Sequence, residues 1–310
     1  MASTITSQSK SPKQLNTEST PNEITQYYYP DPVNHQVIQQ WLFMDLLPWQ
    51  QPTWQYLTTH LHALPHAILF AGNAGTGKRA FVYRFVAWAL CENQRDNAQG
   101  VTTACGQCQS CQWLIANTHP DLYQIPTPTV ARDASPKPKA NNALVAQAPT
   151  RQSGYSIKID EIRELQPFVT QSSGGLRIVV IHQADAMTLA ASNALLKTLE
   201  EPAENVLMLL ISDSPSQLLP TIRSRLQSFS VSHVTPDQSM QAMQQLLPNT
   251  DTATLQQVSE LSGYAPFLAL QMLHSEWYQH RQTWINSFQA VRSGQRMPVQ
   301  ASNYWQKTLT

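Results

Sequence analysis

The stretch Gly72-Asn73-Ala74-Gly75-Thr76-Gly77-Lys78-Arg79 decides the fold of this chain. It lies between the apolar run 67–71 and an amphipathic segment at 81–90, which is the order strand, glycine-rich loop, helix. The spacing matches the motif G-x-x-x-x-G-K-[ST], in which backbone N–H groups surround phosphate oxygens and the lysine reaches the terminal phosphates. The candidate nucleotide-binding residues are therefore Gly72, Gly75, Gly77 and Lys78.

The last position of the motif departs from the pattern, because Arg79 stands where a Ser or Thr hydroxyl would bind Mg²⁺. A guanidinium only donates hydrogen bonds, so it cannot ligate a cation. A P-loop ATPase also needs acidic groups, usually Asp then Glu, at the end of a neighbouring strand. Here that strand ends in His182-Gln183, Asp185 lies beyond it, and Glu200 is expected to be solvated at a helix end. The sequence predicts a degenerate site without hydrolysis, at which ATP binding is weak or absent.

Composition describes a globular chain that is large enough for two or three domains. Its 20 basic and 20 acidic residues give zero net charge and a pI near 7.1. No global field would therefore hold it on DNA, RNA or an anionic membrane, and any nucleic-acid contact must be local or shared with partners. Because no run approaches the ~18 apolar residues that a membrane span requires, we expect a cytoplasmic protein.

All four cysteines lie in one stretch, at Cys91, Cys105, Cys108 and Cys111. Thiols stay reduced in the cytosol, so a cluster of cysteines there indicates a metal site before a disulfide. Four thiolates suit tetrahedral Zn²⁺, and such a site is structural because it leaves no open position for water. Two alternatives are unrelated buried thiols and a zinc ribbon that binds DNA directly. For the ribbon, only Arg95 supplies positive charge between the first and last cysteine.

Residues 45–232 alternate predicted strands and helices, and the β-branched run 178–181 is typical of a parallel strand covered on both faces. This unit contains the zinc module at 91–111. It also contains a Pro/Ala-rich insertion at 126–150 with too little apolar surface to fold. The polar residues 1–44 that precede it are expected to form a disordered tail and lead-in.

The remaining residues have helical patterns. In 233–275 apolar residues recur at three- and four-residue steps, which predicts a small second domain of three helices. The segment 276–310 is also helical in pattern but too short for a stable domain of its own.

Five further runs are distinctive: Leu47 to Pro52 (LPWQQP), His119-Pro120-Asp121, Ile159 to Leu165 (IDEIREL), Ser192 to Pro202 (SNALLKTLEEP) and Thr221 to Arg225 (TIRSR). Together they resemble the subunits of the bacterial DNA polymerase III clamp loader, which belong to the AAA+ class. The resemblance covers about Leu47 to Leu273. It implies an α/β fold with an AAA+ P-loop-type parallel sheet, an inserted four-cysteine zinc module, a three-helix lid, and the truncated beginning of a collar-type helical domain.

The resemblance also implies a function in DNA replication. Such subunits help to load the sliding clamp on primer-template DNA, within a hetero-oligomeric ring that contains gamma/tau and delta subunits. The ring is part of the DNA-directed DNA polymerase holoenzyme, a nucleotidyltransferase complex. The losses at Arg79 and His182-Gln183 resemble a non-hydrolysing member, for which no independent catalytic activity is expected.

Arg225 is the candidate catalytic residue, because it matches the family's arginine finger, which reaches the ATP of a neighbouring subunit. The family's serine-arginine-cysteine motif appears here as Ser224-Arg225-Leu226, so the arginine is kept and a cysteine is lost. A blander interpretation is that Arg223 and Arg225 are solvated charges at a helix end. A competing interpretation is an active AAA+ ATPase that uses Asp185 and a further Mg²⁺ ligand.

Overall fold

The computed structural model describes residues 42–43, 45–97, 100–126, 156–170, 174–231 and 233–308. The tail predicted for 1–44 and the insertion predicted for 126–150 therefore lie, apart from a few residues at their edges, outside the described residues. Leu42, at the edge of the tail, is buried in the core. Within these ranges, no helix combines the length and the apolar character needed to cross a membrane.

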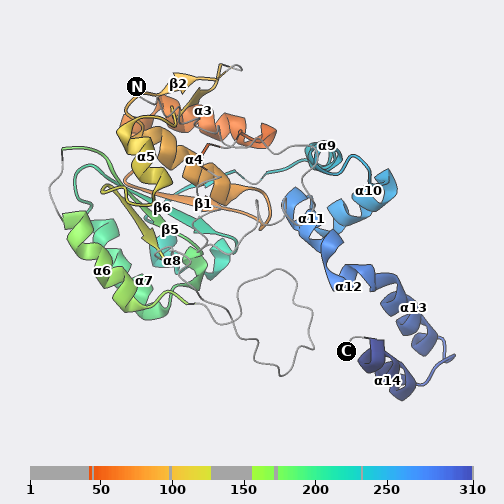
Figure 1. Ribbon diagram of the computed structural model, residues 1–310. Helices are drawn as coiled ribbons and strands as arrows, with labels where there is room; N and C mark the ends of the chain where they lie inside the picture. Colours follow the sequence, from red (N-terminus) through yellow and green to blue (C-terminus); the bar gives the residue numbers. More distant parts are fainter. Residues whose placement is uncertain are drawn as a thin grey trace, which may run out of the picture.

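A five-stranded parallel sheet forms the centre of the first unit (Figure 1). The strands are β1 (Ala67–Ala71), β4 (Leu122–Ile125), β5 (Arg177–Ile181), β6 (Val206–Ser212) and β7 (Gln227–Ser230). Their order is β4-β5-β6-β1-β7, and every neighbouring pair is parallel. Strands β5 and β6 are buried along their whole length, as expected for strands covered on both faces. The predicted parallel α/β sheet is confirmed.

Helices cover both faces of this sheet (Figure 1). One face is covered by α3 (Gln51–Thr59) and α4 (Lys78–Leu90), and the other by α6 (Ile159–Thr170) and α7 (Leu189–Glu200). Side chains of β1 alternate between the two cores: Ile68 and Phe70 join the first, Ala67 and Leu69 the second.

The cysteine module is inserted between α4 and β4. It consists of a short antiparallel pair, β2 (Arg95–Asp96) and β3 (Thr102–Thr103), followed by α5 (Gln109–Ile115). Trp88 of α4 donates a hydrogen bond from its indole N–H to the Thr102 hydroxyl, 3.0 Å away. The module is therefore joined to the helix that follows the glycine-rich loop.

Short elements join the larger ones at the edges of the sheet. They are the 3₁₀ turns η1 (Pro48–Gln50), η2 (Leu61–Ala63), η3 (Ala184–Ala186) and η4 (Pro215–Gln217), and the single-turn helix α8 (Pro220–Arg223). Three of them lie at or next to candidate site residues. The turn η1 contacts the glycine-rich loop, η3 contains Asp185, and α8 ends two residues before Arg225.

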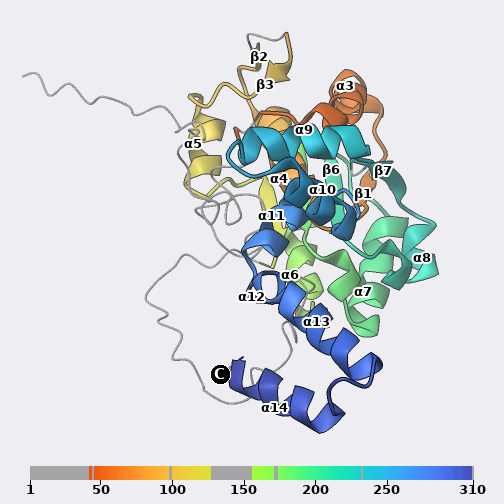
Figure 2. The ribbon, with the colours of Figure 1, turned by 90° about the vertical axis from the view of Figure 1, so that its right-hand side faces the viewer.

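Three helices follow the sheet unit: α9 (Pro236–Leu246), α10 (Thr252–Leu261) and α11 (Pro266–His274). They occupy the segment that the resemblance predicts to be a lid, and we use that name for them. These helices share a core of their own that includes Met243, Leu255 and Phe267. The segments α12 (Glu276–Gln279), α13 (Arg281–Arg292) and α14 (Pro298–Thr308) extend from it (Figure 2). Sheet, inserted cysteine module and lid agree with the AAA+ fold class that the resemblance implies.

Candidate functional site

The glycine-rich loop joins β1 to the N-terminus of α4, as the motif predicts. Gly75 and Gly77 have φ angles of 76° and 83°, a left-handed region that glycine adopts without steric strain. A Cβ atom on Gly75 would lie 2.5 Å from the backbone nitrogen of Leu268 in α11. Glycine is required at this position both by the turn and by the close approach of the lid.

The Lys78 side chain makes all of its polar contacts inside the protein. Its Nζ lies 2.8 Å from the carbonyl oxygen of Gly72, 2.6 Å from that of Asn73 and 2.7 Å from Asp213 Oδ1. The side chain is only 2% exposed, and its burial lowers the pKa, although Asp213 opposes the shift. Since an ammonium group has three N–H donors, these three acceptors use all of them.

Asp213 is a site residue that the sequence reading missed. It follows β6, the strand next to β1, and its second carboxylate oxygen lies 3.6 Å from Arg79 Nη2. Partial burial favours the neutral acid, but the positive charges of Lys78 and Arg79 outweigh it and hold the pKa of Asp213 below its usual value. Lys78, Arg79 and Asp213 form an ion cluster at the edge of the sheet where parallel strands end and ligands commonly bind.

The loop is also covered by segments on either side. Three of its carbonyl groups accept hydrogen bonds: Thr76 from the indole N–H of Trp49 at 3.1 Å, Gly77 from the Gln50 side-chain amide at 3.1 Å, and Gly75 from the backbone N–H of Phe267 at 3.0 Å. The first two donors belong to η1 and the third to α11. The loop is therefore held between the lead-in turn and the lid.

The second cluster of an ATPase is replaced by a neutral network. His182 is fully buried, stacks on Tyr83 and lies 2.6 Å from the Tyr83 hydroxyl oxygen through Nε2. The Tyr83 hydroxyl donates to the side-chain oxygen of Gln124, so His182 Nε2 must be the donor to Tyr83. Burial, with a smaller effect from Arg79, lowers the pKa of His182 to about 3. The imidazole is neutral and gives no negative charge for Mg²⁺.

Asp185, the acid of the competing ATPase interpretation, lies in η3. One of its carboxylate oxygens accepts a hydrogen bond from the Ser212 hydroxyl at 3.1 Å. Its negative charge slightly opposes the lowering of the Lys78 pKa by burial. Asp185 therefore lies on the loop side of the sheet.

The four cysteine sulfurs lie within 4.8 Å of one another and could hold a metal ion. The Sγ atoms of Cys91 and Cys108, and those of Cys105 and Cys111, are each 3.9 Å apart. Ligands 2.3 Å from a tetrahedral Zn²⁺ would lie about 3.8 Å apart, so this spacing fits. Burial alone would raise the pKa of Cys105, but backbone N–H groups of Gln107 and Cys108 help to lower it to about 6. These donors stabilise the thiolate that a metal requires.

Arg225 lies just after α8 and is partly exposed, with 35% of its side chain accessible. Its Nη1 donates to the carbonyl oxygen of Thr221 at 2.9 Å, and its Nη2 lies 2.6 Å from Glu200 Oε1. Glu200, predicted to be solvated, has 50% of its side chain exposed and also pairs with Arg225. Arg223 is exposed and makes no ion pair in the described part of the chain.

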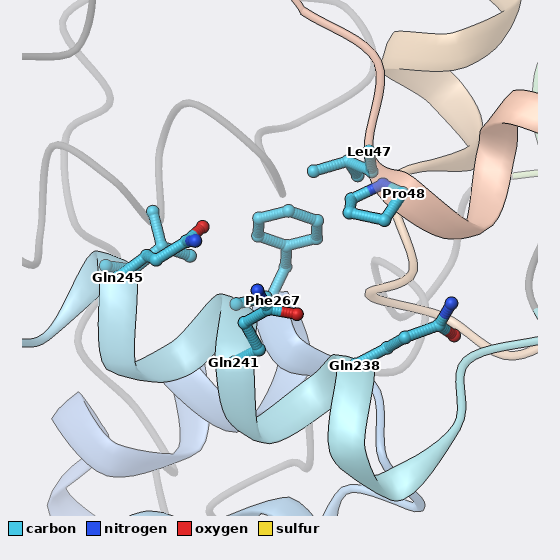
Figure 3. Close-up of a pocket in the computed structure, with 8 residues that line it drawn as sticks. Leu47, Pro48, Gln238, Gln241, Gln245 and Phe267 are labelled. Atoms are coloured by element: carbon cyan, nitrogen blue, oxygen red, sulfur yellow. The ribbon is translucent and has the colours of Figure 1, made fainter.

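A small cavity lies between the lead-in segment and the lid (Figure 3). Its volume is about 120 Å³, and it is lined by Leu47, Pro48, Gln238, Gln241, Ala242, Gln245, Leu246 and Phe267. Typical ligand pockets have roughly 300–1,000 Å³. The cavity is too small for a nucleotide, and none of the described residues that line it is charged.

Comparison with known proteins gives one consistent family. A family model described as DNA polymerase III, delta subunit, matches residues 49–235. The chain is 36% identical to DNA polymerase III subunit delta' of Pseudomonas aeruginosa, over 78% of this chain and 65% of that protein. It is 29% identical to the delta' subunit of Haemophilus influenzae, over 78% and 66%. The chain thus spans just under two thirds of the length of these relatives.

A solved gamma subunit-related protein of DNA polymerase III from Thermotoga maritima aligns with 73% of this chain and 74% of its own, at 18% identity and a TM-score of 0.36.

The ion cluster predicts a pH-dependent stability. Asp213→Asn should lower the free energy of unfolding at neutral pH by about 3 kcal/mol, because the buried Lys78 loses its charged partner. The folded-state pKa of Asp213 is depressed, so its contribution is present above the unfolded pKa and is lost as pH falls through the folded pKa. Denaturant unfolding of both proteins from about pH 7 to about pH 2 should show the difference shrinking in acid.

The matched control is Asp96→Asn, which changes an exposed carboxylate outside the ion cluster. It should leave the unfolding free energy nearly unchanged at every pH. A difference between wild type and Asp213→Asn that stays constant down to the lowest pH would contradict the assignment.

Proposed function

The chain belongs to the DNA polymerase III delta-subunit family, and from this premise we propose that it is a delta prime-like subunit of a clamp loader. In this role it helps to load the sliding clamp on primer-template DNA during cytoplasmic DNA replication. It would work in a ring with gamma/tau and delta subunits, and would contact clamp and DNA through that complex. Zero net charge supports a shared rather than an independent hold on DNA.

We propose that this subunit does not hydrolyse ATP itself. The observation that carries this is the internal pairing of Lys78, whose three donors are used by Gly72, Asn73 and Asp213. A phosphate at the loop would have to displace the Asp213 carboxylate, and both groups are negative. Arg79 instead of a hydroxyl, and neutral His182 instead of an acid, remove the groups that hold Mg²⁺ and orient water.

We further propose that Arg225 acts on the ATP of the neighbouring subunit. Charge builds on the γ-phosphate oxygens during phosphoryl transfer, and an arginine supplied by another chain stabilises it. Arg225 is partly exposed and its guanidinium is fixed by two contacts, which supports such a role. Arg223 has no comparable ion pair among the described residues.

The cysteine cluster is proposed to hold one structural Zn²⁺. Four protein ligands close the coordination shell, so the ion would stabilise the module without taking part in a reaction. The module is joined to α4 and packs beside Phe43, which supports a role in holding this side of the domain together.

The competing function is an active AAA+ ATPase that uses Asp185. The hydrogen bond from Ser212 to Asp185, and the position of Asp185 on the loop side, are the observations in its favour. It requires Asp213 to release Lys78 and Asp185 to hold Mg²⁺.

An ATPase assay on the isolated chain separates the two functions. We expect no Mg²⁺-dependent hydrolysis above background, and Lys78→Ala should leave the ATPase rate of an assembled loader nearly unchanged, because this lysine is not a phosphate ligand. The catalytic loader subunit with its own loop lysine changed to alanine is the positive control and should lose activity. Hydrolysis by the isolated chain that disappears in Asp185→Asn would establish the competing function.

The zinc proposal predicts one tightly held Zn²⁺ per chain after dialysis, measured by metal analysis. Cys108→Ser should lose the metal and melt at a lower temperature, because losing one of four thiolates disrupts a closed site. The control is Ser262→Ala, which changes a buried serine far along the chain from the cysteines and should keep the metal. A metal-to-protein ratio near zero in the parent would refute the proposal.

Arg225→Ala should leave the subunit folded, metal-loaded and able to join the ring, because the residue is partly exposed. It should lower the ATPase rate of the loader, measured with clamp and primed DNA, by at least about tenfold; the best-studied arginine fingers supply ~10³–10⁵. Arg225→Lys should substitute poorly, since lysine lacks the planar fork. Arg223→Ala is the control and should do much less. A normal rate in an assembled Arg225→Ala loader would show that the residue is a surface charge only.

A further inference from the structure

We propose that Glu200 is a positioning residue, which holds the guanidinium of Arg225 in the orientation needed to reach the ATP of a neighbouring subunit. This inference rests on the proposed role of Arg225 and assigns a role at the same surface to a second side chain, that of Glu200. Glu200 is the last residue of α7, and Arg225 follows α8. The two residues are brought together only by the fold.

Two contacts fix the orientation of the Arg225 guanidinium and leave several of its N–H donors available. Nη1 donates to the carbonyl oxygen of Thr221 at 2.9 Å, and Nη2 lies 2.6 Å from Glu200 Oε1. A guanidinium has five N–H donors in a rigid plane. Two are used by these contacts among the described residues, so three remain for an incoming anion. Two acceptors on separate elements define the plane of the group, whereas one would leave it free to rotate.

Both acceptors are carried by elements anchored in the core. Leu199, the neighbour of Glu200, is 2% exposed, and Ile222 in the middle of α8 is fully buried. Both belong to the same apolar cluster, and Figure 2 shows α7 and α8 side by side. The distance between the backbones of Glu200 and Thr221 is therefore set by packing. A site built on anchored elements is held more accurately than one on a loop.

The position of Glu200 at the C-terminus of α7 is electrostatically unfavourable for that helix. A carboxylate at a helix C-terminus faces the negative end of the helix dipole, which is unfavourable. Lys197 is the basic residue that this last turn would be expected to contain. Because Glu200 is 50% exposed, its ion pair adds little to stability. Neither helix energetics nor the stability of the ion pair explains why a carboxylate stands at this position. Its contact with the Arg225 guanidinium is the remaining explanation.

Neighbouring charges provide a natural comparison. Glu201 and Arg223 are also exposed, and neither makes an ion pair in the described ranges. Of the glutamates Glu200 and Glu201 and the arginines Arg223 and Arg225, only one of each takes part in an ion pair in the described ranges. Electrostatic attraction alone does not explain why Glu200 and Arg225 pair rather than Glu201 and Arg223. The packing of α7 against α8 determines which two side chains meet.

The opposite role would be restraint, in which Glu200 keeps Arg225 away from its target. The two roles predict opposite results, because loss of a restraint raises the rate and loss of an orienting contact lowers it. The three remaining donors and the 35% exposure of Arg225 favour orientation.

The test uses the whole loader reconstituted with each variant, clamp and primed DNA. Glu200→Ala should lower kcat of the stimulated ATPase about tenfold, since misorientation of a catalytic group by about 1 Å can cost up to 10²-fold. The KM for ATP should stay within about twofold, because Glu200 does not touch the nucleotide. Glu200→Gln keeps an acceptor oxygen and should retain an intermediate rate. Glu201→Ala is the matched control and should behave as wild type.

Double variants separate this inference from the proposal beneath it. In an Arg225→Ala loader, adding Glu200→Ala should cause no further loss, because the group to be oriented is gone. If Arg225→Ala lowers the rate but Glu200→Ala leaves it unchanged or raises it, the arginine finger stands and the positioning role is overturned. If Glu200→Ala lowers the rate equally in both backgrounds, Glu200 acts elsewhere. If Arg225→Ala itself has no effect, both fail together.

Discussion

The ionic contact between Lys78 and Asp213 is the interaction on which the arrangement around the loop depends. A buried ammonium group needs a compensating charge and hydrogen-bond acceptors. In a P-loop that binds nucleotide, phosphate oxygens meet part of this need. Here the Asp213 carboxylate and two loop carbonyls meet it. The loop can consequently remain covered by Trp49 on one side and the lid on the other without any ligand to neutralise it.

Features that depend on local sequence were predictable. The strand–loop–helix order, the continuous apolar run 178–181 and the grouping of the four cysteines can all be recognised within windows of about 20 residues, because hydrophobic period and ligand spacing are local properties. The structure confirms the parallel sheet and brings the four sulfurs together. Arg79, His182 and Gln183 were recognised as departures because a motif states which residue types each position requires.

The sequence could not show which side chains from distant segments come into contact in the folded protein. Asp213 meets Lys78 because β6 pairs with β1, and Glu200 meets Arg225 because α7 packs against α8. Neither pair has a signature within its own segment, and surface carboxylates are solvated by default. Strand order would have been enough to find Asp213, since it follows directly after the strand beside the loop strand. The Tyr83–His182–Gln124 network likewise depends on three separate elements.

The same ion cluster limits how the protein could change over evolutionary time. Lys78 and Arg79 are positive and Asp213 is negative, and the nearby Asp185 carboxylate, outside the cluster, supplies a second negative charge that acts on Lys78. Replacing Arg79 by serine would leave an excess negative charge beside a phosphate site, and replacing Asp213 alone would leave two buried cations with too little compensation. If the subunit is inactive as proposed, a lineage that acquired nucleotide hydrolysis would need several replacements together, and each single replacement would give a less stable protein. Under the proposed function, the absence of hydrolysis in this subunit would therefore be difficult to reverse, because Lys78, Arg79 and Asp213 hold each other in place.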